Sequence, residues 1–244
     1  MTEKDNLNLM QNSCLGIGDK APSFQANSTM GEIAFPADFE GKWVILFSHP
    51  ADFTAVCTTE FIYFAEMMKE FEQLNTAIIG LSVDGLSSHL GWLNEIETQI
   101  SFNGITNTKI RFPLLEDLSG EISRKYGLIH PAVSMTKAVR GVFFIDPKGV
   151  IRSILFYPQS TGRNFDELKR ILISLQLADK LGVSTPANWQ PGDEVVKKAP
   201  ENISDAEVAS KINKNKSGAW FLSLEDLSKE EIDSVLYVKK TRLN

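Results

Sequence analysis

One segment constrains the fold more than any other: an apolar run, a short polar loop and an amphipathic run follow one another between residues 43 and 73. The first run (43–47) is apolar throughout and rich in β-branched and aromatic side chains, which is typical of a strand covered on both faces. The second run (61–71) repeats apolar side chains at helical spacing, which predicts a helix over about 59–73. A buried strand that leads directly into a helix favours an α/β fold.

Cys57 lies at the junction, where we expect the first turn of that helix. Unpaired backbone N–H groups and the helix dipole favour negative charge there, so the position stabilises a thiolate. The same loop carries His49, the rigid Pro50 and the hydroxyl of Thr54. The alternative is that Cys57 is a small buried apolar side chain, the commoner fate of a cytosolic cysteine. Position alone leaves both interpretations open.

The rest of the chain predicts a mixed sheet. A second apolar strand (77–83) and a helix (87–96) continue the parallel α/β pattern. Two apolar runs (141–145 and 150–156) flank Asp-Pro-Lys-Gly, which predicts an antiparallel hairpin closed by a type I turn. The remaining assignments are a short helix at 119–126, a segment at 112–115 too short to assign, and a strong helix at 164–181 ended by Gly182.

Length and composition predict three parts in the 244 residues. Residues 1–14 read as a mobile N-terminal arm and 15–186 as the main domain. Residues 187–244 hold two short amphipathic stretches and too few apolar side chains for a core of their own. We therefore expect a C-terminal arm that packs on the main domain or at a subunit interface.

Composition also narrows the function classes. A net charge of −6 without a basic block argues against nucleic acid or an anionic membrane as a partner. No apolar run is long enough to span a membrane and the polar N-terminus does not resemble a signal peptide, so we expect a cytoplasmic protein. Two cysteines and the histidines at 49, 89 and 130 lack metal-ligand spacing, so we expect neither a metal nor a cofactor.

The loop around Cys57 resembles the active-site signature of the peroxiredoxins, Pro50-x-x-x-Thr54-x-x-Cys57. The resemblance continues through Phe47-Ser48-His49-Pro50 and Cys57-Thr58-Thr59-Glu60. Further matching segments are 139–146, 157–158, 161–167 and 189–193. The last two of these, together with His49, are similar to the one-cysteine subfamily and its archaeal relatives. This resemblance implies a thioredoxin-like fold with a mixed central sheet flanked by helices, plus a C-terminal extension.

The resemblance also implies a chemistry, the reduction of hydrogen peroxide and organic hydroperoxides. The thiolate of Cys57 would attack one peroxide oxygen and become a sulfenic acid. Thr54 matches the threonine that hydrogen-bonds the thiolate and the peroxide, and Pro50 matches the proline that shields the pocket. Arg140 matches the arginine that lowers the cysteine pKa and stabilises charge on the leaving oxygen.

Three further residues are secondary candidates. Glu60 would orient the arginine, although it could equally be an acid favoured by the helix dipole. Arg163 would supply a second cation, or be a surface charge at a helix start. His49 would line the pocket and contact the oxidised sulfur, or be a core histidine. In some animal relatives a lipase serine precedes the strand; here the segment reads Glu40-Gly41-Lys42-Trp43-Val44, so we expect no phospholipase activity.

No cysteine follows Cys57, which excludes a resolving thiol in the C-terminal region and leaves Cys14 as the one internal candidate. Cys14 is expected to be incidental rather than resolving, so we predict an external reductant: thioredoxin, glutaredoxin or a small molecule. A peroxide sensor or redox-switched chaperone-like assembly is the alternative function, whereas a disulfide oxidoreductase lacks its Cys-x-x-Cys pair. The resemblance further implies a homodimer or a ring of dimers such as a decamer.

Overall fold

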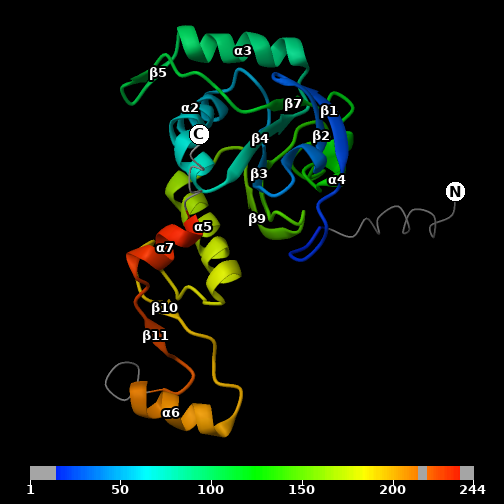
Figure 1. The fold of residues 1–244 in the computed structure, drawn as a ribbon. Helices are drawn as coiled ribbons and strands as arrows, with labels where there is room; N and C mark the ends of the chain where they lie inside the picture. The colour runs from blue at the N-terminus through cyan, green and yellow to red at the C-terminus, as the bar shows by residue number, and fades with distance from the viewer. Residues whose placement is uncertain (1–14, 214–218, 237–244) are drawn as a thin grey trace, which may run out of the picture. The chain divides into compact units, whose positions relative to one another are not determined.

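The computed structural model describes residues 15–213 and 219–236 (Figure 1). The predicted N-terminal arm, with Cys14, and residues 237–244 of the predicted C-terminal arm lie outside the described ranges. The chain divides into two compact units, one formed by the described residues up to 69 together with 76–163, the other by 70–75 and the described residues from 164 onward. The predicted boundary at 186 stays a prediction.

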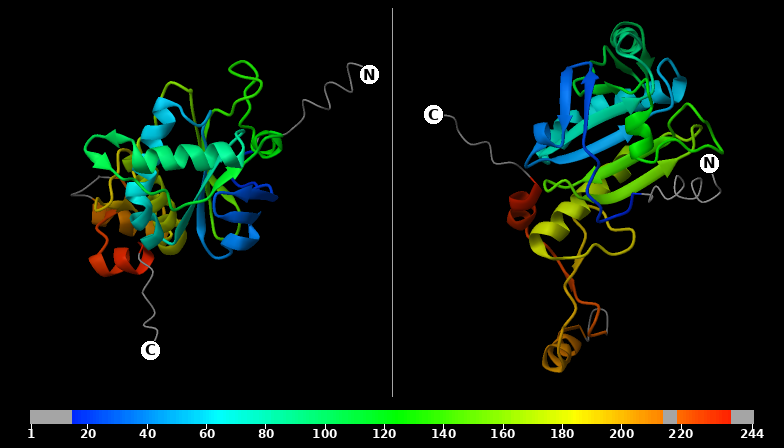
Figure 2. Two further views of the ribbon diagram at one scale, coloured as in Figure 1. Left: turned by 90° about the horizontal axis from the view of Figure 1, so that it is seen from above. Right: turned by 90° about the vertical axis from the view of Figure 1, so that its right-hand side faces the viewer.

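The first unit is built on a seven-stranded sheet of order β2-β1-β7-β4-β3-β8-β9. The right-hand view of Figure 2 follows the strands from blue β1 and β2 to yellow-green β9. The strands are β1 (Phe24–Ser28), β2 (Gly31–Phe35), β3 (Trp43–Ser48), β4 (Thr76–Ser82), β7 (Leu114–Glu116), β8 (Arg140–Ile145) and β9 (Ile151–Tyr157).

The predicted mixed sheet is confirmed. β3 pairs in parallel with β4, and β4 with β7, whereas β3 pairs antiparallel with β8 and β8 with β9. The predicted hairpin has its turn at Asp146–Gly149, where the Gly149 N–H donates to the Asp146 carbonyl at 2.8 Å. Gly149 has a φ of +72°, a conformation that glycine adopts without strain.

The helices of this unit follow the predictions with shifted ends. They are α2 (Ala55–Gln73), which runs on into the second unit, α3 (Leu86–Thr98) and α4 (Glu121–Lys125). The 3-10 turn η1 (Ala37–Phe39) was not predicted as a helix. A small hairpin, β5 (Ser101–Phe102) and β6 (Ile105–Thr106), follows α3. The predicted start of α2 near residue 59 was too late, because the Thr54 carbonyl already accepts from the Thr58 N–H at 3.0 Å.

Alternate side chains of β3 enter two different cores, as strand geometry requires. The Phe47 ring stacks on Phe64 of α2 at 4.1 Å between centroids and meets Phe61 edge-on at 5.5 Å. On the opposite face, Val44 and Leu46 join the cluster that contains Phe143 of β8 and Tyr126, just after α4. The wholly apolar β3 is thus covered on both faces, as predicted.

The second unit begins with α5 (Phe165–Leu181), whose N-cap Asn164 accepts from the Glu167 N–H and whose predicted end at Gly182 is confirmed by a left-handed φ of 67°. It also contains β10 (Val195–Val196), α6 (Ile203–Asn213), β11 (Leu224–Glu225) and α7 (Lys229–Leu236). α7 is tied to α5 where Lys180 Nζ donates to the Val235 carbonyl at 2.7 Å. In the part of the chain that the structure describes, no helix could cross a membrane.

Candidate active site

Cys57 lies in the first turn of α2, two residues after the helix begins, and its side chain is fully buried. The preceding strand, β3, ends at Ser48, so the loop 49–54 connects the C-terminal end of this interior strand to the helix. This local arrangement is what the sequence predicts. The sulfur therefore sits beside the N-terminus of a long helix, whose dipole favours an anion.

Arg140, the first residue of β8, approaches the sulfur from the sheet. Its Nη1 donates to Cys57 Sγ at 3.2 Å and to Glu60 Oε2 at 2.7 Å. The rest of the guanidinium is held by the Gln159 carbonyl, which accepts from Nε at 3.0 Å and from Nη2 at 2.7 Å. With only 2% of its surface exposed, Arg140 is a buried cation directed at the cysteine.

Glu60 joins Arg140 to a second buried arginine, Arg163. Its Oε2 also accepts from Arg163 Nη1 at 2.9 Å, and its Oε1 accepts from the Arg163 backbone N–H at 2.9 Å. Glu60 and Cys57 are three residues apart on α2, so they share a helix face. The predicted grouping of Cys57, Glu60, Arg140 and Arg163 is therefore present as one buried cluster.

Arg163 is enclosed by the ends of β3 and β8. Its Nη2 donates to the Ser48 carbonyl and, at 3.3 Å, to the Gly141 carbonyl, while its guanidinium carbon lies 5.2 Å from the centroid of the Phe47 ring. Burial lowers the pKa of Arg163, and the neighbouring Glu60 carboxylate opposes that effect. The alternative that Arg163 is a surface charge is wrong in this structure.

Ser48, which the sequence did not single out, fixes the backbone on both sides of Arg140. Its hydroxyl donates to the Val139 carbonyl at 2.6 Å and accepts from the Gly141 N–H at 2.9 Å. A Cβ at Gly141 would lie 2.3 Å from the buried Leu128 side chain, which would have to move to make room for it. One hydroxyl thus ties the end of β3 to the start of β8.

Thr54 and Pro50 are placed in the same loop. Pro50 is buried. The Thr54 hydroxyl donates to the Ala51 carbonyl at 2.9 Å, so its single proton is already engaged in this structure. The expected bond from Thr54 to the thiolate is therefore not formed here, although the lone pairs of the hydroxyl can still accept.

His49 is fully buried and belongs to a different cluster from the one around Cys57. Its Nε2 lies 3.0 Å from Asp52 Oδ1, and the other oxygen of Asp52 lies 2.8 Å from His89 Nδ1. Burial lowers the pKa of His49 despite the neighbouring carboxylate. Burial alone would raise the pKa of Asp52, but hydrogen bonds from His49 and His89 outweigh it and hold that pKa well below its usual range.

Asp84 extends this polar cluster. One of its oxygens accepts from the Asp52 backbone N–H and from the Ser82 hydroxyl, both at 2.9 Å. His49, Asp52 and Asp84 come within 4.8 Å of one another and are the one group among the described residues with the spacing of a metal site. Hydrogen bonds within the cluster and to neighbouring backbone account for this grouping without an ion.

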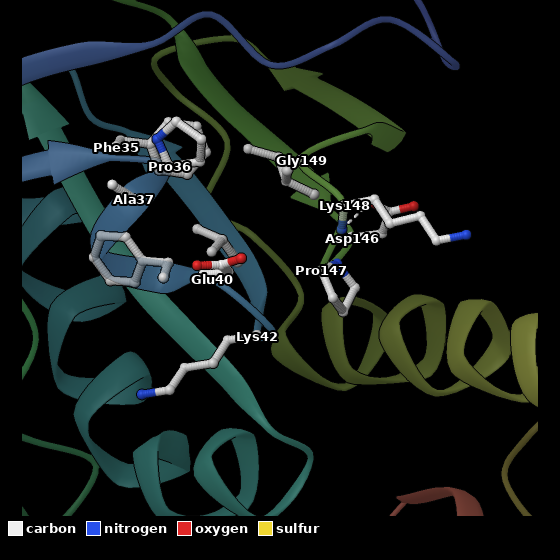
Figure 3. Close-up of a pocket in the computed structure, with 12 residues that line it drawn as sticks. Phe35, Pro36, Ala37, Glu40, Lys42, Asp146, Pro147, Lys148 and Gly149 are labelled. Carbon is white, nitrogen blue, oxygen red and sulfur yellow. Dashed lines mark hydrogen bonds between the residues drawn. The ribbon is translucent and has the colours of Figure 1, made fainter.

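A hollow of 290 Å³ opens at the other end of β3, away from Cys57 (Figure 3). It is lined by residues of the β2–β3 connection and the β8–β9 turn, which are apolar side chains together with Glu40, Lys42, Asp146 and Lys148. Lys42 comes from the segment where a lipase serine would be expected, and none of the residues lining the hollow is a serine or a histidine.

The comparisons with known proteins show the family. The AhpC/TSA family matches residues 17–154, and the C-terminal domain of 1-Cys peroxiredoxin matches residues 174–206. A peroxiredoxin of Methanosarcina mazei is 52% identical over 213 residues, which cover 86% of this chain and 96% of the relative. A peroxiredoxin of Aquifex aeolicus is 47% identical over 186 residues, covering 76% and 81%.

Solved structures of peroxiredoxins also match the chain. A cysteine-to-serine mutant of peroxiredoxin 6 from Arenicola marina matches with a TM-score of 0.75 and 32% identity, covering 88% of this chain and 99% of that one. A yeast mitochondrial 1-Cys peroxiredoxin matches with a TM-score of 0.71 and 36% identity, covering 87% and 100%. These matches confirm the predicted fold, a mixed sheet flanked by helices with further helices at the C-terminus.

Proposed function

Because the chain belongs to the peroxiredoxin family and is therefore a thiol-dependent peroxidase, we propose that Cys57 is the thiol that attacks the peroxide. The substrates are hydrogen peroxide and organic hydroperoxides. Arg140 is the cation that serves the reaction, Glu60 and Arg163 position it, and Thr54 and Pro50 shape the pocket. His49 is proposed as an accessory residue.

The observation that carries this assignment is the buried set of four charged groups. Arg140 and Arg163 supply two positive charges, while Glu60 supplies one negative charge. A thiolate at Cys57 would balance the set, whereas a neutral thiol would leave a net positive charge in the interior, which is costly. The N–H that Arg140 directs at Sγ is the arrangement that suits an anionic sulfur.

In the reaction, the Cys57 thiolate attacks one peroxide oxygen and forms the S–O bond of a sulfenic acid while the O–O bond breaks. The other oxygen leaves as hydroxide or alkoxide and takes up a proton to give water or an alcohol. Negative charge thus moves from sulfur to the leaving oxygen beside Arg140, whose N–H groups are already oriented. The lone pairs of Thr54 Oγ1 can accept the hydroxyl proton of the bound peroxide.

We further propose that an external reductant regenerates Cys57. The yeast 1-Cys relative was solved in a study of thiol resolution through glutathione and thioredoxin systems, which supports such donors for this chain. Cys57 is the free cysteine of the described residues, and no cysteine follows it in the sequence. Glutaredoxin and a small-molecule reductant are the remaining candidates.

The test is peroxide consumption by Cys57→Ser beside the matched variant Cys14→Ser, with each reductant system in turn. We expect C57S to lose turnover and C14S to keep it at the wild-type rate. Turnover that survives in C57S would show that another residue reacts. Loss of turnover in C14S, with a stoichiometric Cys14–Cys57 disulfide in peroxide-treated wild type, would overturn the one-cysteine mechanism. Oxidation without turnover by any reductant would favour the sensor.

The subunit arrangement and the cytoplasmic location also stay proposals. α6 and the segment after it expose Ile203, Val208, Ile212, Trp220 and Phe221, which supports an interface formed by the C-terminal arm. We propose a homodimer or a ring of dimers. Light scattering on wild type and Ile212→Asp should show a smaller assembly for the variant; an unchanged mass would exclude this surface.

A further inference from the structure

Both ring nitrogens of His89 face oxygens that accept: a backbone carbonyl, and a carboxyl group whose lowered pKa keeps it ionised. Nδ1 lies 2.8 Å from Asp52 Oδ2, and Nε2 lies 3.1 Å from the Leu115 backbone carbonyl. A neutral imidazole carries one N–H and one lone pair, so it could satisfy only one of these oxygens. The ring is fully buried, so water offers no alternative partner. The geometry therefore requires that His89 donate from both nitrogens, as an imidazolium does.

Asp52 supplies the matching negative charge. Oδ2 accepts from His89 and Oδ1 from His49 Nε2, so both oxygens are acceptors and neither needs a proton of its own. Hydrogen bonds that favour the ionised form of a carboxyl group lower its pKa, in agreement with the low pKa of Asp52. The pair is thus neutral as a whole, as a buried ion pair must be.

The third ring is that of His49. Its Nε2 carries the proton donated to Asp52, while its Nδ1 is buried and has no hydrogen-bond partner within the described ranges. Burial and the positive charge of His89 both disfavour a second proton on His49. His49 is therefore left as a neutral ring with an unused lone pair.

We propose that His89 is a buried imidazolium paired with the Asp52 carboxylate, and that both are positioning residues that hold His49 neutral, with its proton on Nε2 and a bare acceptor at Nδ1. This assignment connects α3, which carries His89, to the loop that carries Asp52 and Thr54. It gives a role to two charged groups that the cluster around Cys57 does not use.

The imidazole ring of His49 lies against α2, the helix that carries Cys57. Its centroid is 5.0 Å from that of Phe61, which follows Cys57 by one helical turn, and 5.2 Å from that of Trp92. Trp92 in turn donates to the Thr58 hydroxyl at 3.1 Å. A fixed tautomer of His49 therefore places a buried acceptor on the side of α2 that also carries the reactive sulfur.

Two further acids lie near the cluster of His49, Asp52 and His89 and contribute negative charge to its surroundings. Asp84 accepts from the Asp52 backbone and acts on His49, and Glu116 of β7 interacts electrostatically with His89. Glu116 is already engaged by the Asn27 amide and the Leu86 N–H. Both acids favour a proton on the rings, and among the close partners only Asp52 touches His49 and His89 together.

The first test reads the proton positions directly. Long-range proton–nitrogen NMR spectra of ¹⁵N-labelled wild type at pH 7.5 contain signals from three histidines, which His89→Gln and His130→Gln assign. We expect His89 to show two protonated nitrogens and His49 to show a proton on Nε2 alone. A bare nitrogen in His89, or a proton on His49 Nδ1, would overturn the proposal; the variants serve only to assign the signals, and the protonation itself is read on wild type.

The second test measures the rate constant of Cys57 oxidation between pH 8 and pH 6. In H89Q the carboxylate of Asp52 loses its cation, so His49 takes up the proton on acidification and its free acceptor is lost. We expect the variant to fall behind wild type by about 10-fold at pH 6, the lower end of what removal of a histidine-orienting group costs, and to recover toward pH 8.

The control is H130Q, which changes a partly exposed histidine bonded to the Gly127 carbonyl and should follow wild type at every pH. Equal profiles for H89Q and wild type would remove the positioning role. In Asp52→Asn, where an amide cannot balance the cation, His89 should lose one ring proton in the NMR spectrum; retention of both would contradict the pairing. The kinetic test rests on the proposed role of Cys57, whereas the spectra do not, so the two failures are distinguishable.

Discussion

Arg140 donates two hydrogen bonds to a single backbone oxygen, that of Gln159, from Nε at 3.0 Å and from Nη2 at 2.7 Å. Gln159 lies just beyond the end of β9, whose last residue, Tyr157, pairs with Arg140 itself. The β8–β9 hairpin thus returns a carbonyl to the residue at its own start. With Nε and Nη2 held in this way, Nη1 is left to contact both Cys57 and Glu60.

Arg140→Lys should keep the charge and lose the function. An ammonium group on a flexible chain cannot bond the Gln159 carbonyl, Glu60 and the sulfur together, as the planar guanidinium does. We expect Cys57 oxidation by hydrogen peroxide to slow by about 100-fold or more, as measured by stopped flow. Arg152→Lys, at the partly exposed ion pair with Asp146, is the control and should react like wild type. A normal rate in R140K would return Arg140 to a purely structural role.

Glu60→Gln should destabilise the fold as well as slow the reaction. The amide matches the shape of the carboxylate but leaves two buried arginines without their shared anion. We expect the free energy of unfolding, from urea denaturation, to fall by about 3 kcal/mol or more. Glu70→Gln breaks an exposed pair with Lys169 and should cost about 1 kcal/mol at most. Equal losses in the two variants would be inconsistent with a buried ion cluster.

Ser48→Ala should displace Arg140 by loosening the backbone on both sides of it. Removing the hydroxyl leaves the buried Gly141 N–H without its acceptor, which costs about 1–3 kcal/mol. Because Val139 and Gly141 flank Arg140, we also expect oxidation to slow by roughly 10-fold to 100-fold, the effect of a small misplacement. Ser87→Ala, an exposed residue of α3, is the matched control. If S48A loses stability but not rate, the Ser48 bridge does not position the guanidinium.

Acid should destabilise the protein through Asp52. Its pKa is held below the ordinary value of 3.8, so its contribution to stability is present above that pH and is lost as the pH falls further. The lowered pKa of His49 acts in the same direction, because the unfolded ring takes up a proton first. We expect the free energy of unfolding to drop from pH 5 to pH 3, by up to about 1.4 kcal/mol per pH unit for each such group, and less steeply in Asp52→Asn. Parallel curves would exclude Asp52 as a source.

The elements with strong local patterns could be predicted from the sequence. β3 and α2 carry long apolar patterns of distinct period, and Asp146-Pro147-Lys148-Gly149 is a turn with its own chemistry. The β1–β2 hairpin was not predicted, because Phe24–Ser28 and Gly31–Phe35 are only five residues each, too short to show a clear period. The three residues of β7 are likewise too few to show a period.

The sequence predicted those parts of the site that depend on the identity of a side chain. Cys57, Glu60, Arg140 and Arg163 were found through a motif, and the structure brings all four together. The Gln159 contribution is a backbone oxygen, which any residue could supply, so no sequence signal marks it. The pairing of Asp52 with His89 spans 37 positions and depends on where α3 lies, so neither residue stands out in the chain.

The shared acid Glu60 and its partner Arg163 are separated by 103 positions along the chain. A ribosome therefore releases the Cys57 segment long before the residues that complete its charge cluster have been made. Until then the cysteine has no Arg140 beside it and, on the nascent chain, behaves as an ordinary thiol. On the proposed role of Cys57, the arginine that serves the reaction lies 83 positions after it, so the complete charge cluster exists only in a chain made as far as Arg163.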